Sequence, residues 1–180
     1  MINKYFYKVV VLGTILLSAC SAEKTEQKSI EGKSVEDKVI VEGSSTALSL
    51  FELTAKEEEA YINFQKDLNT IHLSELEPIS IAKLYVKAGF DKKYDVEYAL
   101  YTDREEYIQW SKEVDEEIPE SHRGSDEQII KQFKNIDKGT FVQTSDYEGY
   151  IEYDLDEGTN GFQMIKNEDG VWQVSFMPIQ

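Results

Sequence analysis

Downstream of residue 50, apolar residues first recur at the period of a helix. Between residues 54 and 71 they are spaced three and four apart, so that they fall on one helical face. This face carries Tyr61, Phe64, Leu68 and Ile71. Thr54 and Glu57 have the spacing of a capping box at its start. The acidic residues 57–59 would interact there with the helix dipole rather than bind a metal ion. The pattern predicts an amphipathic helix over 54–71.

Two more helices are predicted between residues 78 and 101. The first spans 78–88, and Gly89 is expected to stop it. The second spans about 91–101. Its inward face carries either its three tyrosines or the neighbouring Val96 and Leu100.

The helical period continues as far as Gly139. A helix restarting at Thr102 would bury Tyr107, Trp110 and Val114. A last helix begins with a second capping box, formed by Ser125 and Gln128. Its apolar face carries Ile129, Ile130, Phe133 and Ile136.

Beyond Gly139 the apolar period changes to two, which predicts strands. The first strand covers 141–144, and the second covers 147–153 with an acidic outer face. A polar turn at 154–160 leads to a third strand containing Phe162 and Met164. The Asp-Gly pair at 169–170 forms a hairpin turn before a fourth strand. The inward face of that strand carries Trp172, Val174 and Phe176. Helices followed by an antiparallel meander give an α+β class in one domain, residues 50–180.

The first 20 residues have a different character. Lys4 and Lys8 precede an uncharged apolar run at 9–17, and small residues follow it. A basic start, a short apolar centre and small residues are the parts of a secretory signal. The run is too short for a permanent transmembrane helix, which needs ~20 apolar residues.

The signal ends in Leu17-Ser18-Ala19-Cys20, which resembles the lipobox of bacterial lipoproteins. The resemblance implies that residues 1–19 are removed and that Cys20 receives a diacylglycerol anchor. The protein is then expected at the cell membrane, on its extracytoplasmic face. Because Cys20 is the only cysteine, its lipidation leaves no thiol for a disulfide or for thiolate chemistry. The alternative is an uncleaved anchor with an incidental cysteine.

Residues 20–49 join this anchor to the folded domain. The segment is polar and its charges are mixed in sign, and between residues 21 and 45 its one apolar cluster is Val39-Ile40-Val41. Such a composition buries too little apolar surface to offset the entropy lost on ordering. We expect a flexible tether.

The charge balance excludes one class of partner. The formal net charge is -16, and loss of Lys4 and Lys8 with the signal makes it -18. So acidic a surface repels nucleic acid and offers no basic patch to anionic lipid headgroups. The membrane is reached through lipid, and the expected partner is an envelope protein or a wall component.

Few residues point to catalysis, and we predict no catalytic residue, metal site or cofactor. His72 falls at a helix end and His122 in a polar loop, and no Gly-x-Ser-x-Gly nucleophile elbow accompanies them. The acidic segment 154–160 has oxygen ligands but lacks the spacing of an EF-hand. A hairpin turn accounts for the same residues.

The helices leading into a sheet, together with Gly170-Val171-Trp172-Gln173-Val174-Ser175-Phe176 as a final strand, resemble the NTF2-like (cystatin-like cone) superfamily over residues 79–179. The helix at 54–71 is extra to that pattern. The resemblance implies a cone that can enclose a pocket. Its candidate lining residues are Tyr101, Trp110, Phe162, Met164 and Trp172. The alternative is that these aromatic and apolar side chains fill the cone as core.

Enzymes of that superfamily place an acid or a histidine inside the cone. No Asp, Glu or His falls on the predicted inner strand face, which argues against catalysis. The sequence therefore favours a non-catalytic binding or scaffold lipoprotein. Its alternatives are capture of a small apolar ligand in an open cone and, third, an enzyme of isomerase or hydrolase type. A filled cone would support the scaffold, an apolar cavity the ligand, and a buried acid in a cavity the enzyme.

Overall fold

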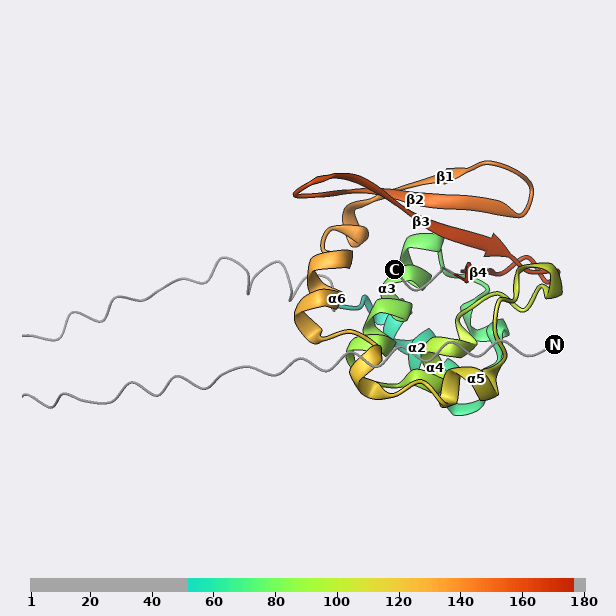
Figure 1. Cartoon of the computed structure of the whole chain (residues 1–180). Helices are drawn as coiled ribbons and strands as arrows, with labels where there is room; N and C mark the ends of the chain where they lie inside the picture. Colours follow the sequence, from blue (N-terminus) through green and yellow to red (C-terminus); the bar gives the residue numbers. More distant parts are fainter. Residues whose placement is uncertain (1–51, 177–180) are drawn as a thin grey trace, which may run out of the picture. The chain divides into compact units, whose positions relative to one another are not determined.

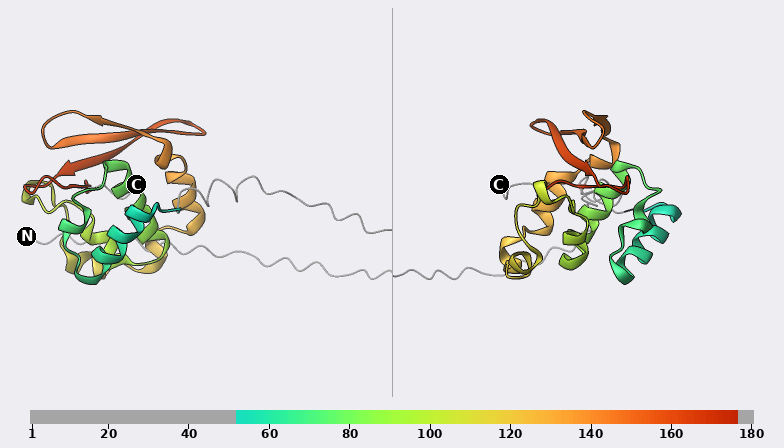
Figure 2. Two further views of the ribbon diagram at one scale, coloured as in Figure 1. Left: turned by 180° about the vertical axis from the view of Figure 1, so that it is seen from behind. Right: turned by 90° about the vertical axis from the view of Figure 1, so that its right-hand side faces the viewer.

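A helical layer and an antiparallel sheet pack against each other in the computed structural model, which describes residues 52–176 (Figure 1). The helices occupy the chain up to Lys138 and the strands follow from Thr140. Viewed from the side, the sheet covers one face of the helical layer (Figure 2). The α+β class is confirmed. The predictions for residues 1–49, including the signal, Cys20 and the tether, lie outside the described residues.

Helix α2 spans Ala55–Asp67 and begins with the predicted capping box. The Glu57 amide donates to Thr54 Oγ1 at 3.3 Å, and the Thr54 amide donates to Glu57 Oε2 at 2.8 Å. The helix ends four residues earlier than predicted, because Leu68 adopts the left-handed conformation and a 3-10 turn, η1 (Thr70–Leu73), follows. Because of this turn, the residues after Asp67 no longer continue the apolar face of α2. Ile71, predicted to face inward, is 59% exposed, and Leu73 is buried instead.

Helix α3, Pro78–Phe90, is the central element of the helical layer and is buried along most of its length. The prediction that it stops at Gly89 is wrong, because the helix continues through Gly89 to Phe90. The residue with left-handed backbone that follows the helix is Lys92. Helix α4 then spans Tyr94–Ala99. It buries Val96, and Leu100 after it is buried too, so the second of the two predicted inward faces is the observed one.

The helix predicted from Thr102 does not form. The segment contains only a 3-10 turn, η2 (Glu105–Tyr107), and a short helix, α5 (Lys112–Glu116). Val114 is 52% exposed rather than buried. A helix does not restart at Thr102 because the Thr102 amide donates to a strand carbonyl and the Asp103 amide donates to a strand side chain.

A 3-10 turn, η3 (Glu120–His122), leads to helix α6, Asp126–Phe133. Its capping box is confirmed, with Ser125 Oγ accepting from the Gln128 amide at 3.3 Å. Phe133 is buried, as is Ile136 in the following turn, η4 (Ile136–Lys138). Ile129 and Ile130 are half-buried.

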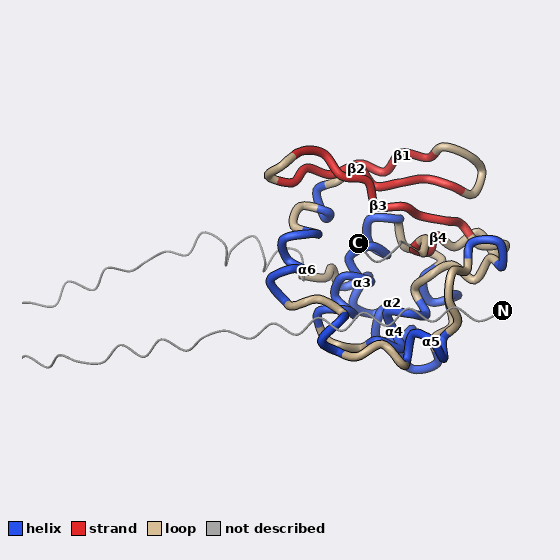
Figure 3. The backbone as a smooth tube through the Cα atoms, in the orientation of Figure 1, coloured by secondary structure: helices blue, strands red, loops and turns tan. Residues whose placement is uncertain are grey.

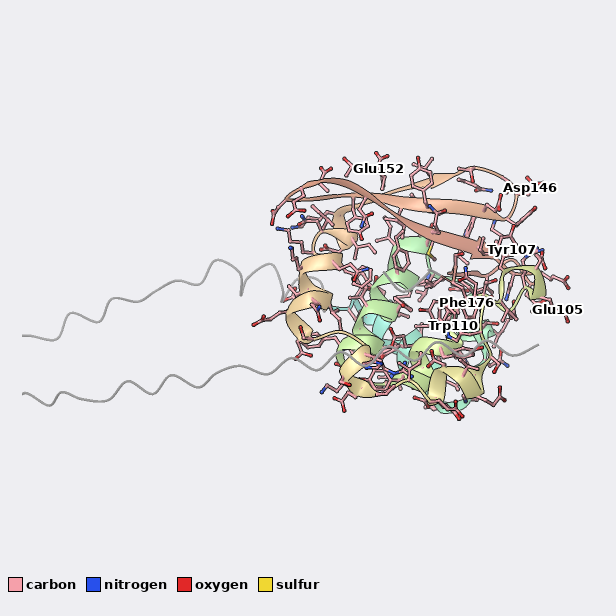
Figure 4. All side chains as sticks on the ribbon, in the orientation of Figure 1. Glu105, Tyr107, Trp110, Asp146, Glu152 and Phe176 are labelled. Carbon is pink, nitrogen blue, oxygen red and sulfur yellow. The ribbon has the colours of Figure 1, made fainter. Side chains whose placement is uncertain are left out.

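The sheet is a four-stranded meander in the order β1-β2-β3-β4. The strands are β1 (Thr140–Gln143), β2 (Glu148–Leu155), β3 (Gly158–Lys166) and β4 (Trp172–Val174). Ile151 pairs with Phe162 and both are buried, whereas Glu152 is exposed and points away from the helices (Figure 4). The alternation predicted for β2 is thus confirmed. Trp172 pairs with Lys166, and Val174 pairs with Met164.

Residues 100–102 attach the helical layer to the edge of β4. The Val174 amide donates to the Leu100 carbonyl at 2.9 Å, and the Thr102 amide donates to the Val174 carbonyl at 2.8 Å. The side chain of Gln173, 1% exposed, donates to the Tyr101 carbonyl at 2.9 Å and accepts from the Asp103 amide at 3.4 Å. The Tyr101 backbone is therefore fixed from both sides.

A buried ion pair joins α2 to α3. Lys83 Nζ lies 2.7 Å from Glu57 Oε2, and the two side chains are 10% and 6% exposed. Burial disfavours the charged form of Glu57, but the hydrogen bonds from Lys83 and the Thr54 amide outweigh it, so the pKa of Glu57 lies below its usual value. The Glu57 carboxylate, which belongs to the capping box, thus also holds α2 against α3.

We expect Lys83→Met to lower the free energy of unfolding by about 3–5 kcal/mol, because it leaves the Glu57 carboxylate buried without its cation. Adding Glu57→Gln should recover a large part of that loss. The matched control is Lys56→Met, whose partner Glu75 is exposed, and which should cost less than about 1 kcal/mol. Urea unfolding of the three variants measures these values. Equal losses for Lys83→Met and Lys56→Met would contradict the prediction.

Candidate functional site

A cavity of about 440 Å³ lies between α3, α4, α6, the segment 110–124 and the β2–β3 pair. The segment closing one side runs largely as loops and short turns (Figure 3). The wall combines aromatic side chains with charged and polar ones. Among them are the aromatic Tyr85, Tyr101, Trp110, Phe133 and Phe162 and the charged Glu97, Asp115 and Arg123.

Two tyrosines and a glutamate form a hydrogen-bonded chain on this wall. The Tyr85 and Tyr101 hydroxyl oxygens are 2.7 Å apart, and Tyr85 is also hydrogen-bonded to the Glu97 carboxyl. An ionised carboxylate only accepts. With Glu97 charged, Tyr85 therefore donates to Glu97 and Tyr101 donates to Tyr85.

The environment of Glu97 favours its neutral form. Burial raises its pKa to about 7, the nearby charge of Arg123 opposes that rise, and the charge of Asp115 adds to it. Gly89 of α3 leaves room for this carboxyl, since a Cβ at position 89 would lie 2.9 Å from Glu97 Oε1. Gly89 therefore does not end α3. Because it has no side chain, the Glu97 carboxyl can pack against α3 at this position.

Asp115 and Arg123 form a second buried ion pair at the cavity. Arg123 Nη2 lies 2.9 Å from Asp115 Oδ2, and Asp115 Oδ1 accepts from the Trp110 indole at 3.1 Å. Arg123 also donates to the carbonyls of Asp115 and Ile118, and its guanidinium lies 4.2 Å from the centre of the Tyr94 ring. These contacts fix the loop and orient Trp110, which lies beside Phe176 (Figure 4) and also packs edge to face against Tyr101.

Three of the five predicted lining residues reach the cavity, namely Tyr101, Trp110 and Phe162. The other two, Met164 and Trp172, do not line it. Met164 is fully buried in the core. Trp172 packs instead against Phe141, with ring centres 4.8 Å apart, and beneath the Lys166 ammonium at 4.6 Å.

Sequence reasoning missed Glu97, because it looked for an acid only on the inner strand face. The acid of this cavity comes from α4. A signal was available: Glu97 precedes Tyr101 by four residues, so a helix reaching 101, as predicted, would place both side chains on one face. Tyr85, Asp115 and Arg123 carried no comparable signal.

The other residues considered for chemistry lie elsewhere or at the margin. His72 Nε2 is 3.1 Å from Asp67 at the end of α2, and His122 is exposed at the cavity wall. Residues 154–160 belong to the β2–β3 hairpin, but the turn is shorter than the predicted 154–160, because the strands stay paired up to Leu155 and Gly158. Within residues 52–176, no three His, Cys, Asp or Glu side chains are grouped to hold a metal ion. No helix in this range is long and apolar enough to cross a membrane.

No protein-family model, curated protein sequence or solved structure matches this chain. The resemblances to lipoproteins and to NTF2-like domains therefore remain predictions from the sequence.

Glu97→Gln should stabilise the protein at high pH and have little effect at low pH. The folded pKa of about 7 exceeds the usual 4.5, so the wild type loses stability as the pH rises from about 4.5 to 7, whereas a neutral glutamine does not. At about pH 8 we expect a gain of ~1–3 kcal/mol.

Thermal melts at about pH 4.5 and pH 8 measure the difference. The exposed Glu116→Gln on α5 is the control and should change little at either pH. A Glu97→Gln gain that is the same at both pH values would mean that Glu97 is not held in its neutral form.

Proposed function

We propose that this chain is a lipid-anchored, extracytoplasmic binding protein whose domain, an NTF2-like cone, takes a small ligand into the cavity beside Glu97. One observation carries the proposal: a cavity of about 440 Å³ whose wall combines aromatic rings with a chain of polar groups from three elements. Ligand pockets commonly measure about 300–1,000 Å³ and have this mixed lining.

The cavity changes the order of the alternatives drawn from the sequence. A filled interior would have supported a scaffold for an envelope protein or wall component. The cavity supports ligand capture, and the buried Glu97 in its wall supports the enzyme alternative as well. The polar chain narrows the ligand further. A purely apolar molecule would leave the Glu97 carboxyl without the hydrogen bonds that water gives it, which costs free energy. The ligand is expected to combine an apolar or aromatic part with a polar group.

Acid–base catalysis is a second candidate, of the isomerase or hydrolase class. Glu97 supports it, because a carboxyl with a pKa of about 7 can both give and take a proton near neutral pH. The hydroxyl groups of Tyr85 and Tyr101 continue the hydrogen-bonded chain from the Glu97 carboxyl, and a proton can pass along such a chain. A bound compound that is recovered chemically changed, and unchanged after incubation with Glu97→Gln, would favour the enzyme.

The membrane anchor is tested by Cys20→Ser. The lipobox makes Cys20 the site of acylation, so its loss should move the protein from the membrane fraction to the soluble one, because two acyl chains supply the stable attachment. Fractionation and blotting of cells expressing each form measure this. A variant that stays in the membrane pellet as firmly as wild type would refute the lipid anchor.

Ligand capture is tested by thermal melts of the detergent-solubilised full chain with a panel of small aromatic amines, alcohols and carboxylic acids. We expect some compounds to raise the melting temperature. A compound present at 100 times its Kd should stabilise the folded state by about 2.7 kcal/mol. Ile129→Trp should abolish the rise, since Ile129 lines the cavity.

Ile130→Trp is the matched control on the same helix. Ile130 is also half-buried but does not belong to the cavity wall, so its variant should still respond. No response from any compound in the wild type would refute ligand capture.

A further inference from the structure

The charges around the cavity do not balance. The charges of Asp115 and Arg123 neutralise each other, with Arg123 Nη2 2.9 Å from Asp115 Oδ2. Arg123 also donates hydrogen bonds to the backbone carbonyls of Asp115 and Ile118. Glu97 has no ion-pair partner among the described residues, and its hydrogen-bond partner, Tyr85, is neutral. With Glu97 ionised, this part of the wall carries one uncompensated negative charge.

The groups that face Glu97 come from every element around it. Helix α3 supplies Tyr85 and the space at Gly89, the segment after α4 supplies Tyr101, α5 supplies Asp115, and the loop before α6 supplies Arg123. Of these, only Arg123 is cationic, and Asp115 already uses it. A cation from outside the chain is therefore the group that would complete the site.

The rest of the wall suits an organic cation rather than a metal ion. Tyr85 packs with its ring centre 5.7 Å from that of Phe162 and 6.4 Å from that of Phe133. On another side Tyr101 and Trp110 meet edge to face at 5.7 Å. Aromatic rings attract ammonium groups through their negatively polarised faces and bury the attached carbon chain. A bare metal ion would need several oxygen ligands, and one unpaired carboxylate does not supply them.

We infer that the cavity selects a small ammonium compound with an aromatic or apolar group, and that Glu97 is its counter-ion. The inference rests on the proposed ligand-binding function and names the class of ligand. The ammonium hydrogens would donate to Glu97, and the apolar part would lie beside the partly exposed rings of Tyr101 and Trp110. An anion at the same place would meet the Glu97 charge and is rejected.

Titration calorimetry with three probes of similar size tests the inference, using the full chain in detergent at about pH 8. The probes are 2-phenylethylammonium, the neutral 2-phenylethanol and the anion phenylacetate. We expect the ammonium probe to bind at least about tenfold more tightly than the alcohol, the scale of one charge-assisted hydrogen bond. Glu97→Gln should remove that preference, and the exposed Glu116→Gln should keep it.

The wild type alone provides a second test. Glu97 takes up a proton below about pH 7, so the affinity for 2-phenylethylammonium should fall, approaching tenfold per pH unit below that point. The affinity for 2-phenylethanol should stay constant over the same range. This pH series needs no variant, so a Glu97→Gln protein that fails to fold would not prevent a decision.

The outcomes separate the inference from the function beneath it. If the alcohol binds as tightly as the ammonium probe, or if phenylacetate binds best, the cavity takes ligands and the assignment of a cation is overturned. If the ammonium preference survives in a folded Glu97→Gln, Glu97 is not the counter-ion. If no probe binds and the wider panel also gives no thermal response, the proposed ligand function itself fails.

Discussion

The structure depends on the pairing of residues 100–102 with the edge of β4. Two backbone hydrogen bonds and the buried amide of Gln173 hold this short segment in an extended form. It ends the helical run of α4 and directs the chain into the loop that closes the cavity. It also fixes Tyr101, whose hydroxyl begins the chain to Tyr85 and Glu97. One edge contact between the layers thus organises the site.

The sequence predicted those parts of the fold whose causes are local. Both capping boxes and the alternation of β2 are as expected, because caps and pleats depend on residues a few positions apart. The errors have non-local causes. Nothing near Thr102 reveals that its amide donates to Val174, more than seventy residues away. Ile71 faces solvent because Leu68 turns left-handed, a conformation that a leucine rarely adopts.

The site was predicted in part for the same reason. Tyr101, Trp110 and Phe162 were found because aromatic residues at regular spacing face an interior, which is a local pattern. Met164 and Trp172 share that pattern, and the register of β4 decides that they pack as core. Glu97 was missed because its raised pKa comes from burial and from the charge of Asp115, which only the folded chain brings near it. The residues next to Glu97 in the sequence do not indicate that it will be buried.

The ion pair between Glu57 and Lys83 has a mechanical consequence. In the proposed lipid-anchored arrangement, a pulling force from the membrane would enter the domain at the start of α2, the first described helix. The pair lies one turn from that point and connects α2 to the central helix α3. Lys93, the N-cap of α4, donates to Gln65 of α2 at 2.7 Å and links α2 to the next helix as well. Load on the tether would therefore be carried to the helix at the centre of the fold before it reached the loops around the cavity.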